Sequence, residues 1–147
     1  MTIEVKGIKL NYEILGEGSD ILFLHGWGAS LESFKRMIAP LSSHFRCISL
    51  DAPGCGKSDL PSEPLTPQDY CEITKEFMDK IGIKDPIMIG HSNGGRTILN
   101  MCADGLVSPK KIVLFGAAGI RNKKTFKQKV RQATYKTCRR VLTLPII

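Results

Sequence analysis

A serine flanked by small residues is the side chain of this sequence whose surroundings best suit covalent chemistry. Ser92 is the centre of Gly90-His91-Ser92-Asn93-Gly94, which follows the apolar run 86–89 and precedes a helical pattern over 94–104. A strand that turns sharply into a helix exposes such a hydroxyl, and small residues two positions away on either side let the strand and helix approach each other. The pattern predicts a nucleophilic serine; the alternative is an ordinary strand-to-helix turn capped by Ser92.

A serine nucleophile needs partners that the sequence does not supply. Its hydroxyl is weak unless a base, usually a histidine held by a carboxylate, removes the proton. In folds built on this turn the acid and the histidine come later in the chain. The 53 residues after Gly94 contain no histidine and a single acid, Asp104, at the end of a predicted helix. None of His25, His44 and His91 fits the role of base.

The second segment whose residues suit catalysis is the loop His25-Gly26-Trp27-Gly28, which directly follows an apolar run over 20–24. Acyl transfer needs two N–H groups directed at the developing oxyanion. We expect one from Asn93, the residue after the nucleophile, and the other from this loop, at Trp27. His25 ends a buried strand beside the glycines, so we expect it to position the loop through hydrogen bonds rather than transfer protons.

The third segment, Asp51 to Asp59, is a glycine-rich loop with a lysine and a serine. A phosphate-binding loop of the form G-x-x-x-x-G-K-[ST] would need a glycine where Asp51 stands, so nucleotide binding is disfavoured. We expect a structural loop in which Asp51 and Ser58 bond to nearby backbone.

The elements that must position these segments follow from hydrophobic periodicity and turn residues. Alternating apolar residues over 2–15 predict a hairpin, and Thr66-Pro67-Gln68-Asp69 predicts a capped helix start. Further strands are predicted at 20–24, 45–50, 86–90 and 111–115, and helices at 30–41, 66–81, 94–104 and 122–142. This alternation predicts an α/β fold: a mostly parallel sheet of about six strands with helices on both faces.

Together the three segments resemble the α/β-hydrolase fold superfamily, in order and spacing and over nearly the whole chain. The loop 25–28 is similar to its oxyanion loop, 51–59 to its D-x-P-G-x-G-x-S-D loop, and 90–94 to its nucleophile elbow. The most similar branch contains carbon–carbon bond hydrolases and esterases, and a serine at position 92 disfavours the epoxide hydrolase and haloalkane dehalogenase branches. The resemblance implies a serine hydrolase acting on a small-molecule ester or C–C bond without a cofactor, with Ser92 as nucleophile and Trp27 and Asn93 as oxyanion donors.

The sequence departs from this family after the predicted sixth strand. In the family the acid follows a later strand, and the histidine lies in a loop after the eighth. The resemblance implies that residues 1–120 are the N-terminal portion of the core, and that 121–147 begin a basic helical cap within which the chain is truncated. Strand 111–115 is apolar on both faces. We expect it to be an open edge that aggregates or is completed by missing C-terminal sequence or by self-association.

The amino-acid composition limits which class of protein this is and which partners it can bind. A hydrophobic content of 42% suits a globular protein, and no apolar stretch approaches the roughly 20 residues that cross a bilayer. The five cysteines form no CxxC motif, so we expect reduced thiols, no metal and a cytoplasmic location. The N-terminus shows no signal-peptide pattern.

The net charge of +7 is unevenly distributed. Residues 1–109 hold 10 Lys and Arg against 14 Asp and Glu, whereas 110–147 hold 11 Lys and Arg and no acid. The basic segment 121–140 is interpreted first as a cap helix that favours acidic substrates, then as a solvated helix face, and last as a nucleic-acid or membrane patch. We expect a small-molecule substrate, and neither nucleic acid nor membrane as partner.

Two other functions stay open at this stage. Without a base or acid, the chain as written could be a catalytically inert fragment or a binding protein. The same scaffold could also serve an acyltransferase or a perhydrolase, since acceptor choice depends on the cap and the late loops.

Overall fold

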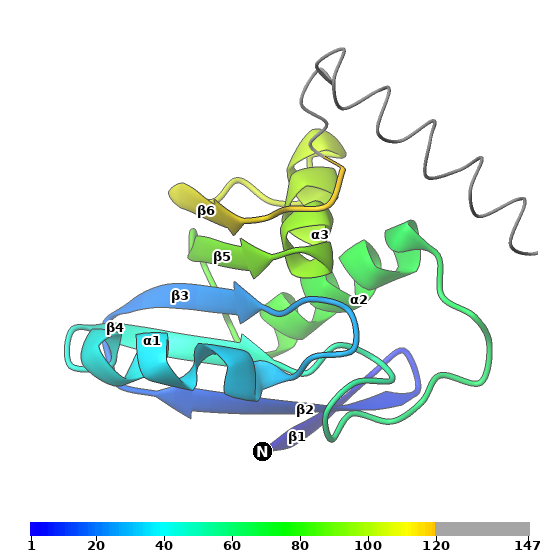
Figure 1. Cartoon of the computed structure of the whole chain (residues 1–147), viewed down its shortest axis with the longest axis horizontal. Helices are drawn as coiled ribbons and strands as arrows, with labels where there is room; N and C mark the ends of the chain where they lie inside the picture. The colour runs from blue at the N-terminus through cyan, green and yellow to red at the C-terminus, as the bar shows by residue number, and fades with distance from the viewer. Residues whose placement is uncertain (120–147) are drawn as a thin grey trace, which may run out of the picture.

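The computed structural model describes residues 1–119, which form one twisted six-stranded sheet with helices on both faces (Figure 1). The strand order is β1-β2-β4-β3-β5-β6. β1 and β2 form an antiparallel hairpin, β2 pairs antiparallel with β4, and β3 to β6 run parallel to one another. The strands are β1 (Thr2–Val5), β2 (Ile8–Leu15), β3 (Ser19–Leu24), β4 (Phe45–Leu50), β5 (Ile87–His91) and β6 (Lys111–Phe115). The predicted fold class is confirmed.

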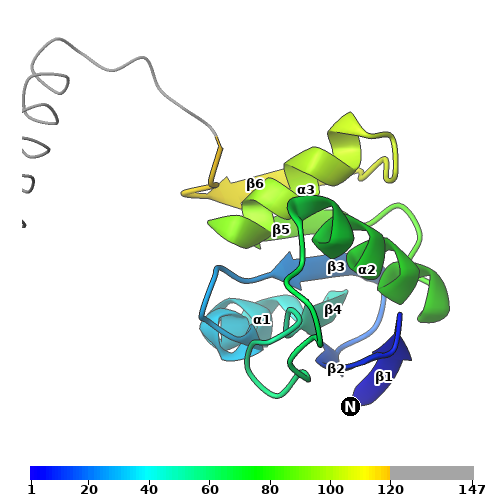
Figure 2. The same cartoon turned by 90° about the vertical axis from the view of Figure 1, so that its right-hand side faces the viewer.

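The helices cover the sheet in two layers (Figure 2). The 3₁₀ helix η1 (Leu31–Phe34) and α1 (Lys35–Leu41) lie on one face, while α2 (Pro67–Lys80) and α3 (Asn93–Ala103) lie on the other. Alternate side chains of the strands therefore enter two separate cores. On the η1 and α1 side, Phe23 packs on Phe34 with ring centroids 5.2 Å apart; on the α2 side, Tyr12 meets Phe77 at 5.3 Å.

The start of α2 is the element that local sequence specifies most completely. The Thr66 side chain accepts a hydrogen bond from the Asp69 amide, and the Asp69 carboxylate accepts one from the Thr66 amide. These reciprocal bonds satisfy amides that the helix itself leaves free, and Pro67 occupies a position where no amide is needed. The bonds to Thr66 lower the pKa of Asp69.

The helix predicted over 30–41 is divided in the structure. Its first turn is the 3₁₀ helix η1, and Ser30 makes no side-chain cap bond. The Leu31 amide is held instead by the Asp51 carboxylate at 2.7 Å, a bond from a segment twenty residues away. This tertiary bond replaces the local cap that the sequence predicted at Ser30.

The parallel arrangement brings three loops together. The carboxyl ends of β3, β4 and β5 lie side by side. The loop after Leu24, the loop after Leu50 and the turn at Ser92 therefore start from neighbouring points (Figure 1). The three segments that the sequence pattern indicated therefore lie together at the carboxyl ends of the parallel strands.

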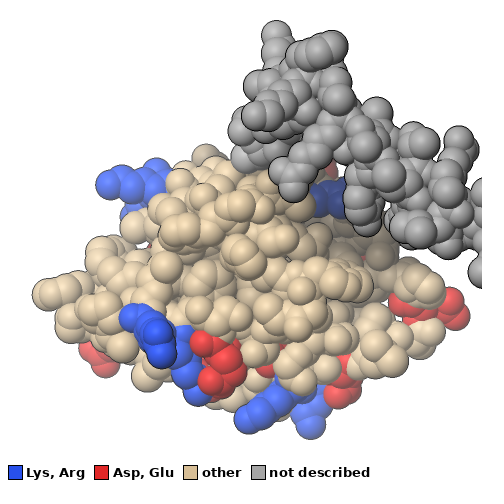
Figure 3. All heavy atoms as spheres, viewed as in Figure 1, with Lys and Arg blue, Asp and Glu red and all other residues tan. Residues whose placement is uncertain are grey.

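Strand β6 forms the outer edge of the sheet among the described residues. Ile112, Val113 and Phe115 are large apolar side chains that remain substantially exposed on it. The face seen in Figure 3 is largely uncharged across its middle, with charged groups towards its margins. The open apolar edge expected from the sequence is thus present in residues 1–119.

The predicted helix 122–142 and the predicted cap segment 121–147 lie outside the described residues. Within the described part, no helix is both long and apolar enough to span a membrane.

Candidate functional site

Ser92 occupies the sharp turn between β5 and α3 in an unusual backbone conformation. Its φ is 48° and its ψ is −110°, in a region that costs a non-glycine residue about 1–3 kcal/mol. Hydrogen bonds from both sides hold it there: the Ser92 amide donates to the Phe115 carbonyl at 3.0 Å, and the Ser92 carbonyl accepts from Ala118 at 2.9 Å. The end of β6 therefore stabilises the strained turn.

The glycines around Ser92 are required by close packing. A Cβ on Gly94 would overlap the carbonyl oxygen of Leu24 at the end of β3, and a Cβ on Gly90 would lie 2.6 Å from the backbone of Gly95. Neither position can hold a larger residue without moving the strand or the helix. The small residues at 90 and 94 thus act as the sequence pattern predicted.

The loop after β3 lies directly against this turn. A Cβ on Gly26 would come within 3.2 Å of the Ser92 Cβ and 2.8 Å of Nδ1 of His91. The Trp27 amide follows in the same loop, and the Asn93 amide opens α3, where the first N–H groups have no helical partner. Within residues 1–119 neither amide donates a hydrogen bond to the protein. Both predicted oxyanion donors therefore belong to segments that adjoin Ser92.

His25 is buried with both ring nitrogens engaged. Its Nε2 accepts a hydrogen bond from the Ala52 amide at 3.0 Å, so the proton resides on Nδ1, which donates to the Gly26 carbonyl at 2.7 Å. Because the ring has no free lone pair, it cannot accept a proton from Ser92 in this arrangement. The bonds match the positioning role expected from the sequence.

Asp51 is the buried hub of the loop that follows β4. Its carboxylate accepts hydrogen bonds from the Leu31 amide at 2.7 Å, the Asn11 side chain at 2.8 Å and the Lys57 amide at 2.9 Å. Its carbonyl accepts from the Ser58 hydroxyl at 2.7 Å. The local bonds to Lys57 and Ser58 were predicted; those to Asn11 and Leu31 were not, because no sequence pattern links these distant positions.

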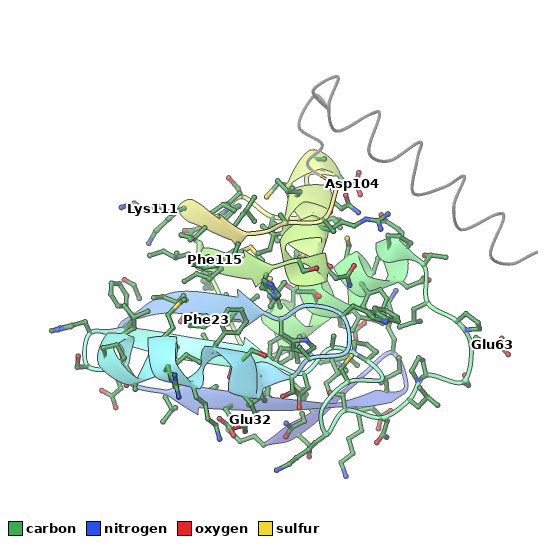
Figure 4. All side chains as sticks on the ribbon, viewed as in Figure 1. Phe23, Glu32, Glu63, Asp104, Lys111 and Phe115 are labelled. Carbon is green, nitrogen blue, oxygen red and sulfur yellow. The ribbon has the colours of Figure 1, made fainter. Side chains whose placement is uncertain are left out.

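The other residues that could act as base or acid lie far from Ser92 or do not face it. His44 precedes β4 at the opposite edge of the sheet, about 20 Å from Ser92 at the roughly 3.3 Å rise of a strand residue. Asp104 ends α3, about 16 Å from its start at 1.5 Å per residue (Figure 4). His91 is exposed with its ring against Gly26. All three histidines of the chain lie in the described residues, and none is placed to activate Ser92.

A hollow of about 470 Å³ opens beside the loop that carries Trp27. Its walls come from the loops 27–28, 53–55 and 60–65 and from the start of α2. Trp27 and Tyr70 meet edge to face at 6.3 Å across it. Burial, followed by the nearby Cys55, raises the pKa of Tyr70, so its phenol is neutral. Sequence reasoning missed this hollow because its walls are separate along the chain.

The cysteines and acids of the described residues suggest no metal centre. Cys47, Cys55, Cys71 and Cys102 are free, and burial raises the pKa of Cys47, Cys71 and Cys102. Between residues 1 and 119, no three His, Cys, Asp or Glu side chains cluster closely enough to hold a metal ion.

Comparison with known proteins gives this arrangement a family. The profile of a family described as "alpha/beta hydrolase fold" matches residues 21–136. The 2-hydroxy-6-oxo-6-phenylhexa-2,4-dienoate hydrolase of Comamonas testosteroni is 30% identical over 122 residues, which are 80% of this chain and 43% of that protein. The dihydrolipoyllysine-residue acetyltransferase component of the acetoin cleaving system of Cupriavidus necator is 30% identical over 111 residues, 75% of this chain and 29% of that protein.

Solved structures agree on the fold. The crystal structure of an alpha/beta hydrolase fold protein from Burkholderia ambifaria superposes with a TM-score of 0.78 at 23% identity, covering 99% of this chain and 53% of that one. The chain thus corresponds to the N-terminal portion of the fold and spans less than half the length of the two curated relatives above.

Proposed function

The chain belongs to the alpha/beta-hydrolase fold family, and we propose that it carries the nucleophile and oxyanion-binding part of a serine hydrolase. The observation that carries the proposal is the backbone of Ser92, at φ 48° and ψ −110°, with the Gly26 loop packed against it. Strain at a strand-to-helix turn is retained where surrounding contacts enforce it, and it exposes the hydroxyl.

In the proposed reaction the Ser92 oxygen attacks the carbonyl carbon of a small-molecule ester or of a ketone next to a scissile C–C bond. A base takes the hydroxyl proton, and the amides of Trp27 and Asn93 bind the oxyanion that forms. Collapse of this intermediate releases the alcohol or carbon leaving group, which takes up the proton, and leaves an acyl group on Ser92. Water then hydrolyses that acyl ester and restores the serine.

The proposal requires a base and an acid partner from outside these 147 residues. His25 is engaged by Ala52 and Gly26, and His44 is at the far edge of the sheet. The curated relatives named above are more than twice as long as the region they share with this chain, which leaves room for such groups in them. The free cysteines favour a cytoplasmic setting for the whole protein.

A fluorophosphonate probe tests the nucleophile. In the complete gene product we expect covalent labelling that Ser92→Ala abolishes and that Ser19→Ala, exposed at the start of β3 and away from the elbow, leaves unchanged. Labelling that persists in Ser92→Ala would refute the assignment.

Acyl transfer to an acceptor other than water is the second candidate, favoured by the name of the Cupriavidus necator relative. An inert or binding-only chain is the third, favoured by the lack of a base among the described histidines. Turnover of p-nitrophenyl acetate in the presence of an added alcohol separates the three: free acetate indicates a hydrolase, the new ester a transferase, and neither product an inert chain.

A further inference from the structure

We infer that His91 is a positioning residue: its imidazole sets how closely the loop after β3 approaches Ser92, and so places the Trp27 amide for the oxyanion. The inference rests on the proposed function, because it takes Trp27 as an oxyanion donor. It gives His91 a role that requires contact with the loop and no transfer of a proton.

His91 lies on the opposite face of β5 from α3. Alternate side chains of a strand point to opposite faces of the sheet. Gly90 faces α3, since a Cβ there would lie 2.6 Å from the backbone of Gly95. His91 therefore shares the face of Ile89, which belongs to the core that contains Phe34 of η1. The elbow is thus packed against α3 through one face and can meet the loop after β3 through the other.

The imidazole of His91 rests against Gly26. Among the described residues, the heavy atoms nearest to a Cβ built on Gly26 are Nδ1 of His91 at 2.8 Å, Cβ of Ser92 at 3.2 Å and Cε1 of His91 at 3.3 Å. The bare Cα of Gly26 therefore faces the ring and the nucleophile at once. Close-packed atoms resist further approach, so the ring limits how near the loop can come to the elbow.

The contact with His91 complements the hydrogen bonds of the loop. The Gly26 carbonyl accepts a bond from Nδ1 of His25 at 2.7 Å and one from the Ala29 amide at 3.2 Å. These bonds orient the peptide that follows Gly26. Both donors lie within three residues of Gly26, so the bonds by themselves do not set the distance from the loop to β5. His91 can set it, because it comes from the strand that ends at Ser92.

The distance from the loop to the elbow matters because an oxyanion donor tolerates little displacement. Such a donor acts at roughly 2.7–3.1 Å from the oxygen that becomes charged, and a misplacement of about 1 Å can cost about 100-fold in rate. Truncation of His91 to alanine would leave space beside Gly26 into which the loop can shift. We therefore expect a loss of rate from a side chain that donates no proton and touches no substrate.

The first test compares rates of fluorophosphonate labelling in the complete gene product. His91→Ala should slow labelling about 3- to 10-fold. His91→Asn should restore it to within about twofold, because asparagine keeps a heavy atom in the place of Nδ1 and takes up no proton. His44→Ala is the control, since His44 is also exposed but lies at the far edge of the sheet. An asparagine variant as slow as the alanine variant would mean that the imidazole proton matters, and would overturn the inference.

A double-mutant cycle tests the contact itself. Gly26→Ala directs a methyl group at the ring, so His91→Ala should return part of the labelling rate that Gly26→Ala loses, about threefold or more. Gly28→Ala is the matched control: a Cβ there meets nothing within 4 Å, so its effect and that of His91→Ala should multiply. Effects that multiply in the Gly26 cycle as well would contradict the proposed contact.

Crystal structures separate this inference from the proposed function. Between the wild type and His91→Ala we expect the Trp27 amide nitrogen to move by about 0.5 Å or more relative to the Ser92 hydroxyl. A loop that stays in place would overturn the inference even if Ser92 is labelled. A loop that moves in a protein that fluorophosphonates never label would refute the serine hydrolase instead, while His91 would still be shown to place the loop.

Discussion

His25 and Ala52 are joined by a hydrogen bond in which the Ala52 amide donates to Nε2 of the imidazole at 3.0 Å. The bond uses the ring's lone pair and leaves Nδ1–H to donate to the Gly26 carbonyl at 2.7 Å. The Gly26 oxygen and the Trp27 N–H belong to one planar trans peptide and point in opposite directions. The Ala29 amide donates to the same oxygen at 3.2 Å, so His25 and Ala29 together fix the direction of the Trp27 amide.

Replacing His25 by alanine should therefore impair catalysis without removing a proton carrier. We expect kcat to fall about 10- to 100-fold, somewhat below the roughly 10²–10³-fold loss caused by deleting an oxyanion donor, with KM little changed. The pH dependence of kcat should keep its shape. Steady-state kinetics across pH, with His44→Ala as the control at the far edge of the sheet, checks this. Loss of the acidic limb in His25→Ala would make His25 the base and contradict the positioning role.

Gly26 and Gly28 lie in the same loop and should respond differently to alanine. At Gly26 the new Cβ would meet the His91 ring at 2.8 Å and Ser92 at 3.2 Å, so the loop must move away from the nucleophile. At Gly28 the Cβ would meet nothing within 4 Å, but the residue has a φ of 68°. We expect Gly26→Ala to reduce the rate of fluorophosphonate labelling at least about tenfold, because a misplaced oxyanion donor weakens stabilisation of the transition state.

Gly28→Ala should cost about 1 kcal/mol of stability through its backbone strain and leave labelling nearly intact. Comparing labelling rate with urea unfolding for both variants separates the two effects. Equal labelling rates in the two variants would show that close approach at Gly26 does not matter.

Asp51 should be a stability residue rather than a catalytic one. Alanine would leave the amides of Leu31 and Lys57 and the amide group of Asn11 without their acceptor. We expect a loss of about 3 kcal/mol in the free energy of unfolding, because buried donors lose charge-assisted bonds. Asp51→Asn should recover only part of it, since its NH₂ group must face one of these donors. Urea unfolding measures both variants, and an unchanged midpoint in Asp51→Ala would rule out the hub.

Local patterns predicted the elements whose causes are local. The elbow at Ser92 could be predicted because its glycines lie two positions away on either side. A strand-like apolar run precedes them and a helical pattern follows them. The start of α2 could be predicted because Thr66 and Asp69 bond to each other. The bonds between Thr66 and Asp69 span three residues and depend little on the rest of the fold. The elbow has a local pattern, but its strained backbone is also held by Phe115 and Ala118, which no local pattern predicted.

The features that the sequence did not predict depend on segments that meet only after folding. The first turn at Leu31 is held by Asp51 instead of by Ser30, which converts the expected helix start into a 3₁₀ turn. The hollow arises where Trp27, Leu60 and Tyr70 approach from three separate elements. No spacing rule connects such positions, because their proximity is set by the order of the strands.

The open edge at β6 should make the 147-residue chain associate. Ile112, Val113 and Phe115 expose apolar surface on β6, and among residues 1–119 no strand pairs with its outer side, a combination that favours pairing with another strand. We expect sedimentation velocity to show species that grow with concentration, and Val113→Lys to reduce them. Leu15→Lys, on β2, should not. A sharp, concentration-independent monomer of 16.2 kDa would contradict this expectation.

The assignment of Ser92 as nucleophile is tested most directly by mapping the covalent adduct. The complete gene product is treated with a fluorophosphonate, digested, and sequenced by tandem mass spectrometry. We predict a single modified residue, Ser92, in the peptide that spans the elbow. A stoichiometric adduct at any other residue, with Ser92 unmodified, would contradict the account.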